Sequence, residues 1–307
     1  MSIQVQEYLR KFEPKDYKNK DNIILLSDED INYPLIRDKY QQGKFDGTPM
    51  FFKKLPINTL IFGLASGNLF NHVGIPTPHG IICQKDDLNE LLLGTQDIGQ
   101  LPCKDIEIHQ ASDLPFCRRK LTFNMLTKVP SKWTILYNND ERQELLKIMT
   151  EECLDQLINI MLIDELRADN DRHWGNFFFY KEKGADKFQG IIVIDVDNTR
   201  LLRQFSKNPK VAFPLFKHSE FISWTALHYT DKEQSYAKRI KALQKLIQNN
   251  NLNNGQIATL KQTLAYDLPK EIKNLSAEHG LSQESRFIYD MTSRLWEYNN
   301  QNLRKEL

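Results

Sequence analysis

Two short stretches decide the fold that this sequence predicts: Asp171-Arg172-His173-Trp174-Gly175-Asn176 and, further along the chain, Ile194-Asp195-Val196-Asp197. Between them, residues 176–180 and 190–196 are largely apolar and flank a turn rich in Lys, Gly and Asp, which predicts a β-hairpin. A loop precedes this hairpin, and the second strand of the hairpin ends in aspartate. We therefore expect the side chains of Asp171, Asn176 and Asp195 to gather at one end of the hairpin.

Two carboxylates and an amide at one site are suited to phosphoryl transfer. That reaction needs a carboxylate to orient and deprotonate the attacking hydroxyl, and hard oxygen ligands to hold Mg²⁺ against the phosphates. Asp171, Asn176 and Asp195 provide these groups. The alternative is structural: Asp171 and Asp195 cap turns, and Asn176 adopts a left-handed conformation that asparagine tolerates.

The regions around these motifs differ in their predicted secondary structure. The first half predicts one helix at about residues 58–72, and short strands at 22–26, 50–55, 80–84 and 90–93. From about residue 140 a helical period dominates, with further helices predicted at 231–248, 256–274 and 283–305. We therefore predict an α+β fold with a small antiparallel β-rich lobe, residues 1–97, and a larger, mainly helical lobe, residues 98–307.

The two motifs resemble the catalytic and metal-binding motifs of the HipA-like serine/threonine kinases, whose wider relatives include the phosphoinositide kinases. Three upstream segments are similar to successive parts of that family: its strand with the ATP-binding lysine, the helix and turn that follow, and its hinge strand. These segments are residues 52–56 (FKKLP), 65–78 (ASGNLFNHVGIPTP) and 90–97 (ELLLGTQD). The resemblance covers roughly residues 48–205 and implies a bilobal, protein-kinase-like fold.

The resemblance also implies roles for the residues of the two motifs. Asp171 would be the catalytic base. His173, in the same loop, would either polarise a phosphate or hydrogen-bond to the loop backbone. Asn176 and Asp195 would bind Mg²⁺, and Asp197 would either join a second metal ion or cap the following turn.

The nucleotide would be bound by upstream residues. The backbone of Gly94, Thr95 and Gln96 would face adenine, and a lysine would contact the α- and β-phosphates. Neighbouring residues on a strand point to opposite faces, so only one of Lys53 and Lys54 can enter the cleft. The match to the family's Lys-Leu-Pro favours Lys54, and the alternative is that both lysines are solvated.

Two departures from the family pattern bear on activity. The helix position that carries the glutamate paired with this lysine falls at Gly63, and residues 58–72 include no acidic residue. The lysine would then need another carboxylate or the phosphates as its partner, so either nucleotide binding is rearranged or activity depends on an activator. The loop at residues 43–47 (GKFDG) offers only a weak phosphate-binding pattern, and an ordinary loop is an equal interpretation.

Composition excludes several other classes. The chain has 307 residues, 40% of them hydrophobic, and a net charge of +1, so nothing favours binding along a nucleic-acid backbone. Its longest apolar runs are too short to span a membrane, and no cleavable signal peptide is visible at the N-terminus. The four cysteines are scattered, which predicts reduced thiols and a cytoplasmic protein; secretion into a host cell without a signal peptide is the alternative.

The implied function is ATP- and Mg²⁺-dependent phosphorylation of Ser or Thr on a protein, as by a toxin-type kinase of a toxin–antitoxin pair or a bacterial effector. A phosphoinositide or inositol phosphate kinase is one alternative. A pseudokinase that serves as a binding module is another, suggested by the missing glutamate. Basic residues at 118–120 and between 200 and 217 would either lie on a solvated surface, or dock an acidic protein or inositol phosphate. The implied partners are a protein substrate and an antitoxin or an inositol phosphate or phosphoinositide activator.

Overall fold

The chain divides into two compact units. The computed structural model describes residues 5–12, 23–26, 40–85, 91–114, 139–169, 172, 174–199, 202, 212–214 and 233–307. The first unit comprises Met1–Lys104, Asp195–Asp197 and Leu268–Asp290; the second comprises Asp105–Ile194, Asn198–Asp267 and Met291–Leu307. The predicted division at residue 97 assigned 195–197 and 268–290 to the second lobe, whereas in the structure they join the first unit.

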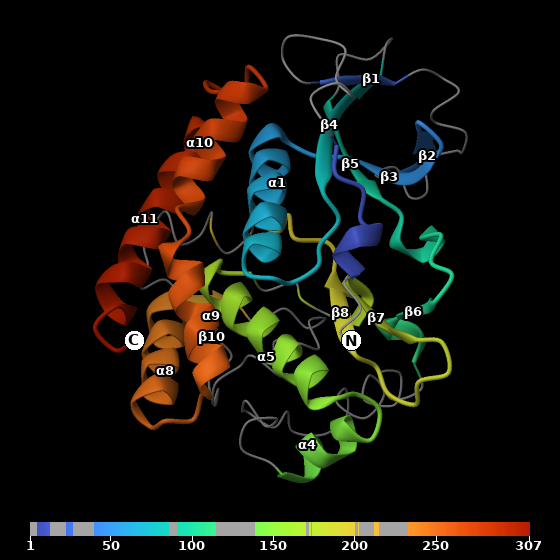
Figure 1. The fold of residues 1–307 in the computed structure, drawn as a ribbon. Helices are drawn as coiled ribbons and strands as arrows, with labels where there is room; N and C mark the ends of the chain where they lie inside the picture. The colour runs from blue at the N-terminus through green and yellow to red at the C-terminus, as the bar shows by residue number, and fades with distance from the viewer. Residues whose placement is uncertain are drawn as a thin grey trace. The chain divides into compact units, whose positions relative to one another are not determined.

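A five-stranded sheet forms the centre of the first unit (Figure 1). Its strand order is β1-β4-β5-β3-β2, with β1 and β4 parallel and every other pair antiparallel. The strands are β1 (Ile24–Leu26), β2 (Tyr40–Phe45), β3 (Thr48–Lys54), β4 (Gly80–Lys85) and β5 (Leu91–Gln96). The structure thus has strands where the sequence predicts them, and β2 in addition. Short 3-10 turns lie at η1 (Val5–Tyr8) and η3 (Ile98–Gln100).

One face of this sheet carries a buried cluster, and the other faces helix α1 (Ile57–His72). The cluster consists of Ile24, Leu26, Met50, Phe52, Ile81, Cys83 and Leu92. Ten residues of α1 are buried, which explains why the helix lacks a polar stripe. Helix α10 (Leu268–Glu278) lies beside α1, and the Asn68 amide donates a hydrogen bond to Glu271 Oε1 at 2.7 Å (Figure 1).

The single helix predicted at residues 256–274 is wrong. The structure has two helices there, α9 (Asn254–Ala265) and α10, separated at Tyr266 and Asp267. Pro269 lies in the first turn of α10, where its missing N–H is tolerated, but the same residue would break a continuous helix. Pro269 is therefore the sequence signal for the break, although the helical period of apolar residues continues across it.

The second unit combines a small sheet with the remaining helices. Its antiparallel sheet has the order β6-β7-β8, and β7 and β8 form the predicted hairpin. The strands are β6 (Ile106–Gln110), β7 (Phe177–Glu182) and β8 (Gly190–Val193), with a separate pair β9 (Ala212–Pro214) and β10 (Glu233–Ser235). The helices are α4 (Asn139–Leu146), α5 (Glu151–Leu166), α8 (Tyr236–Gln248), α9 and most of α11 (Arg286–Leu303), with 3-10 turns η4 (Ala111–Asp113) and η5 (Trp174–Asn176).

Helix α5 is the central helix of the second unit. It packs against β8, α8 and α9, and most of its residues are buried. Thr150 caps its first turn, where the hydroxyl accepts a hydrogen bond from Cys153 N at 3.2 Å. At its other end, the buried Tyr236 hydroxyl donates to Asn299 Oδ1 at 2.7 Å, and the Asn299 amide donates to Leu166 O at 2.8 Å. The C-terminal end of α5 is therefore fixed by α8 and α11.

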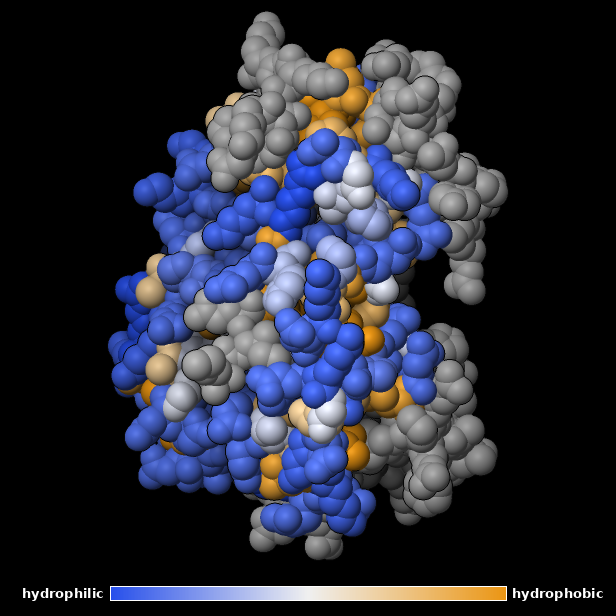
Figure 2. Space-filling view, turned by 45° about the vertical axis from the view of Figure 1, so that its right-hand side comes forward, coloured by the Kyte–Doolittle hydropathy of each residue, from blue (hydrophilic) through white to orange (hydrophobic). Residues whose placement is uncertain are grey.

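On the face drawn in Figure 2, most described side chains are hydrophilic, and hydrophobic ones show in small groups. Among the described residues, the large hydrophobic side chains that are exposed are Leu25 and Phe287. No helix in the described part of the chain is long and apolar enough to cross a membrane.

Candidate active site

A lysine on β3 meets two carboxylates in the first unit. The Lys53 ammonium forms ion pairs with Asp195 and with Asp197, whose Oδ2 lies 3.4 Å from Lys53 Nζ. The side chains of Lys53, Asp197 and Asp195 are 12%, 15% and 37% exposed. Burial raises the pKa of the Asp197 carboxyl, while the nearby ammonium lowers it. The arrangement places one cation between two anions that come from a distant part of the chain.

Strand alternation explains why Lys53 has this position. Met50 and Phe52 point into the buried cluster on one face of the sheet, so Lys53 points to the other. Lys53 stands opposite Leu93 in the β3–β5 pairing, and the Leu93 side chain lies beside Gly63 of α1. Lys53 therefore lies on the face of the sheet that α1 covers.

The turn after β8 directs Asp195 away from the strand. In the second unit, Ile194 N donates to Asn176 O at 3.1 Å, and Arg172 Nη1 donates to Ile194 O at 2.7 Å. Both backbone groups of Ile194 are thus bonded, and the chain then turns at Asp195, whose φ is +55°. Aspartate is among the few residues that adopt this left-handed conformation readily, so the turn costs little.

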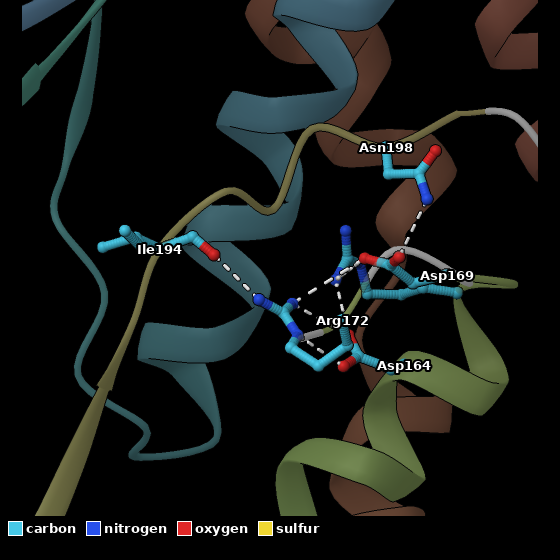
Figure 3. A network of polar contacts seen from close by, with 6 residues as sticks. Asp164, Asp169, Arg172, Ile194 and Asn198 are labelled. Carbon is cyan, nitrogen blue, oxygen red and sulfur yellow. Dashed lines mark hydrogen bonds and ion pairs between the residues drawn. The ribbon is translucent and has the colours of Figure 1, made fainter. Parts of the chain in front are cut away.

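A buried network of charges links the end of α5 with Arg172 in the second unit (Figure 3). Arg172 binds Asp164 through two hydrogen bonds, Nε to Oδ2 at 2.8 Å and Nη2 to Oδ1 at 3.1 Å. Arg167 donates to Asp164 Oδ1 at 3.0 Å, and Asn198 donates to Asp169 Oδ1 at 3.0 Å. The four charged side chains are at most 2% exposed.

Charge balance allows this network to be buried. Two guanidinium groups face two carboxylates, and the paired hydrogen bonds between Arg172 and Asp164 are of the strong, charge-assisted kind. Burial raises the pKa of the Asp164 carboxyl, and the two arginines act in the opposite direction. The network ties the end of α5 to the chain on both sides of Asp195, at Ile194 and at Asn198.

A scan of the sequence against protein-family models finds no match, and a search of curated proteins finds none. Solved structures do match. The Helicobacter pylori proinflammatory kinase CtkA aligns with a TM-score of 0.50 and 12% identity over 91% of this chain and 94% of its own. A chain from the complex of HipA, HipB and operator DNA of the Shewanella oneidensis MR-1 toxin–antitoxin system aligns with a TM-score of 0.54 and 11% identity. That alignment covers 86% of this chain and 61% of the other.

The fold is that of the HipA-like kinases. This finding confirms the α+β, protein-kinase-like fold that the motifs predict. At identities this low the likeness concerns the fold alone, and a fold by itself does not fix the chemistry of a site.

Within the kinase fold, β3 is the strand expected to carry the ATP-binding lysine. The sequence favours Lys54 for this role, but the structure brings Lys53 to the carboxylates, whereas Lys54 is exposed. The difference has a simple physical reason. Sequence shows that two adjacent lysines occupy opposite faces, and only packing decides which face α1 covers.

The predicted adenine-binding segment lies inside the sheet. Gly94 and Thr95 belong to β5, a central strand, and pair with β3 on one side and β4 on the other. A Cβ at Gly94 would lie 2.9 Å from Ile81 and 3.1 Å from both Cys83 and Phe52. The glycine is thus required by packing in the core. Gln96, at the end of β5, is buried, and its Oε1 accepts a hydrogen bond from Arg10 N at 2.9 Å.

The remaining predicted residues divide into two groups. Asp171 and His173 lie outside the described residues. Asn176, the last residue of η5, is buried and bonded through its backbone to Ile194, the residue before Asp195. Among the described residues, no group of three or more His, Cys, Asp or Glu side chains is arranged to hold a metal ion. The oxygen donors of Asn176, Asp195 and Asp197 nevertheless suit Mg²⁺, which in phosphoryl transfer is held by few protein groups together with phosphate oxygens.

Sequence reasoning missed the buried network. The sequence motifs assign no role to Asp164, Arg167 or Asp169, and they include Arg172 only as part of the stretch from Asp171 to Asn176. The signal that could have found them is a cluster of charges directly after the apolar run of α5, because charged residues at such a position are buried only in pairs.

Proposed function

We propose that this chain is an ATP- and Mg²⁺-dependent kinase that transfers the γ-phosphoryl group to a Ser or Thr hydroxyl of a protein. The observation that carries the proposal is the ion-paired group of Lys53, Asp195 and Asp197 on the α1 side of the sheet. A lysine on this strand and a carboxylate directly after the β7–β8 hairpin are the groups that a kinase uses for phosphates and metal.

Lys53 is the proposed phosphate-binding residue. Its side chain is largely buried, so its charge is poorly screened and acts strongly on a nearby anion. Holding Asp195 and Asp197 in ion pairs also keeps the ammonium at a fixed place before nucleotide binds. Pre-organisation of this kind reduces the cost of ordering the site when the nucleotide arrives.

Asn176 and Asp195 are the proposed Mg²⁺ ligands. Bound Mg²⁺ would neutralise charge on the phosphates. The protein's own contribution is to fix the two ligands: Asn176 through its backbone bond with Ile194, and Asp195 through the left-handed turn that follows. Arg172 adds to this by holding the Ile194 carbonyl.

Asp171 is the proposed general base for the attacking hydroxyl, by its resemblance to the family's catalytic aspartate. Arg172, the next residue, is anchored to Asp164 by two hydrogen bonds. A protein substrate and an antitoxin-like partner are part of the proposal, by analogy with the structure in which HipA is in complex with HipB and operator DNA.

A labelling assay tests the proposal. Purified protein is incubated with Mg²⁺ and γ-labelled ATP, alone and with a generic protein substrate. We expect label on Ser or Thr, and a loss of about 100-fold or more in initial rate in Lys53→Met and in Asp195→Asn. Lys54→Met is the matched control and should stay within a few-fold of the unmodified chain.

Three results would overturn the proposal in different ways. Unchanged labelling in both Lys53→Met and Asp195→Asn would show that these residues take no part in phosphoryl transfer. Label transferred only to phosphoinositide would make the protein a lipid kinase. No transfer, together with no thermal shift from ATP, would make it a binding module.

A further inference from the structure

Gly63 leaves room on α1 at the position where the resemblance expects a glutamate. A Cβ added to Gly63 would lie 2.9 Å from Asp197 Cβ, 3.5 Å from Asp197 Cα and 3.5 Å from Leu93 Cδ2. A separation below 3.0 Å is essentially never seen for real Cβ atoms. Asp197 therefore occupies the space that any side chain at position 63 would need.

The Asp197 carboxylate points from this place to Lys53. Its Oδ2 lies 3.4 Å from Lys53 Nζ, and its side chain is less exposed than that of Asp195. Asp195 is the proposed Mg²⁺ ligand, so a bound metal ion would compete with Lys53 for its carboxylate. Asp197 is then the carboxylate that stays with the lysine.

We infer that Asp197 is the positioning residue for Lys53, supplying from the chain after β8 the carboxylate that α1 does not supply, and that Gly63 is the residue that makes room for it. The inference rests on the proposed function, because it assumes that Lys53 binds phosphate. It also removes the difficulty that the missing glutamate presents: the lysine keeps a carboxylate partner, which comes from a different part of the chain.

Two single variants test the inference by separate routes. Asp197→Asn removes the charge and keeps the shape, and Gly63→Ala pushes Asp197 away while leaving the carboxylate intact. We expect each to raise the KM for ATP about tenfold or more, with a smaller change in kcat. Unchanged ATP kinetics in both variants would overturn the inference.

Gly67→Ala is the matched control for Gly63→Ala. Gly67 lies one turn further along α1, and a Cβ there would meet Thr77 Cγ2 at 3.7 Å and Pro78 O at 3.8 Å, which are ordinary contacts. Both changes raise helix propensity equally. A KM effect equal in the two variants would overturn the steric part of the inference.

The Mg²⁺ dependence separates a lysine partner from a metal ligand. If Asp197 positions Lys53, the Mg²⁺ concentration for half-maximal rate stays within about twofold in Asp197→Asn, while in Asp195→Glu it shifts strongly. A comparable shift in Asp197→Asn would make Asp197 a metal ligand and overturn the inference.

Exchange of the two residues provides a rescue test. Asp197→Gly removes the carboxylate and the Cβ that blocks position 63, and Gly63→Glu then places a carboxylate on α1. We expect the double variant to recover at least tenfold in kcat/KM for ATP over Asp197→Gly alone. No recovery would overturn the inference that a carboxylate, at position 197 or at position 63, positions Lys53.

A measurement without nucleotide distinguishes failure of this inference from failure of the proposed function. Urea unfolding midpoints are compared for the unmodified chain, Lys53→Met, Asp197→Asn and the double variant. If the midpoint shift of the double variant differs from the sum of the two single shifts, Lys53 and Asp197 interact. If it equals that sum, the inferred pair is overturned. A coupled pair in a chain that never transfers phosphate would overturn the proposed function and leave the pair intact.

Discussion

Arg172 donates a hydrogen bond to the backbone carbonyl of Ile194 at 2.7 Å, and so joins one sequence motif to the first residue of the other. The same guanidinium holds Asp164 with two hydrogen bonds. One side chain thus connects Asp164, near the end of α5, with the residue before Asp195. The stability of this part of the second unit should depend on it.

Replacing Arg172 should destabilise the protein strongly. Arg172→Met leaves the Asp164 carboxylate buried with Arg167 as its remaining cationic partner of the two. We expect a loss of about 3–5 kcal/mol in the free energy of unfolding. Arg142→Met is the control, because Arg142 pairs with Glu151 at the surface and should change stability by at most about 1 kcal/mol. Urea unfolding measures the free energy of unfolding of both variants. Similar losses in the two would show that the buried network contributes no more to stability than the surface pair.

Gly94→Ala should destabilise the first unit by overpacking. Its Cβ would meet Phe52, Ile81 and Cys83 at 2.9–3.1 Å, and we expect a loss of about 1–3 kcal/mol. Thermal unfolding of the variant provides the measurement, with Gly67→Ala as the control that should be neutral or stabilising. A fully stable Gly94→Ala protein would show that the core can relax around the methyl group.

The Asp97 carboxyl should make stability depend on pH. Burial raises its pKa above the ordinary value of 3.8, against the hydrogen bonds from Gln100 and Gly99 that lower it. The folded state therefore holds this proton more tightly than the unfolded state. Its contribution to stability is complete below pH 3.8 and is lost as the pH rises through the folded-state pKa.

Comparison with Asp97→Asn isolates this contribution. Unfolding free energies of both proteins are measured in steps from pH 3.5 upward. As the pH rises through the folded-state pKa of Asp97, the free energy of unfolding of the unmodified chain should fall relative to that of Asp97→Asn. A shift of opposite sign would mean that the hydrogen bonds to Asp97 outweigh its burial.

Cys153 should be chemically inert in the folded protein. It is completely buried in α5, and burial raises the pKa of its thiol, so little thiolate forms at neutral pH. We expect iodoacetamide to modify Cys153 only after denaturation, as followed by mass spectrometry of its peptide. Equal rates in native and denatured protein would contradict the buried position of α5.

Local patterns predict much of the fold. The apolar runs and turn residues around 176–196 predict the β7–β8 hairpin, and Gly74 after the predicted helix marks the end of α1. The break between α9 and α10 was missed although Pro269 marks it, because the helical period continues on both sides. Short β6 was missed because an isolated five-residue strand carries little periodic signal.

Side chains alternate along every strand, so the adjacent positions of Lys53 and Lys54 already require that they lie on opposite faces. The sequence also shows that α1 has no acidic residue to offer a lysine. Long-range packing selects which lysine meets a carboxylate and which segment supplies that carboxylate. Lys53 and Asp195 are 142 residues apart in the chain, and no local pattern encodes a contact made by packing segments so distant. The absence of a side chain at Gly63 has meaning only once Asp197 is seen to fill the space.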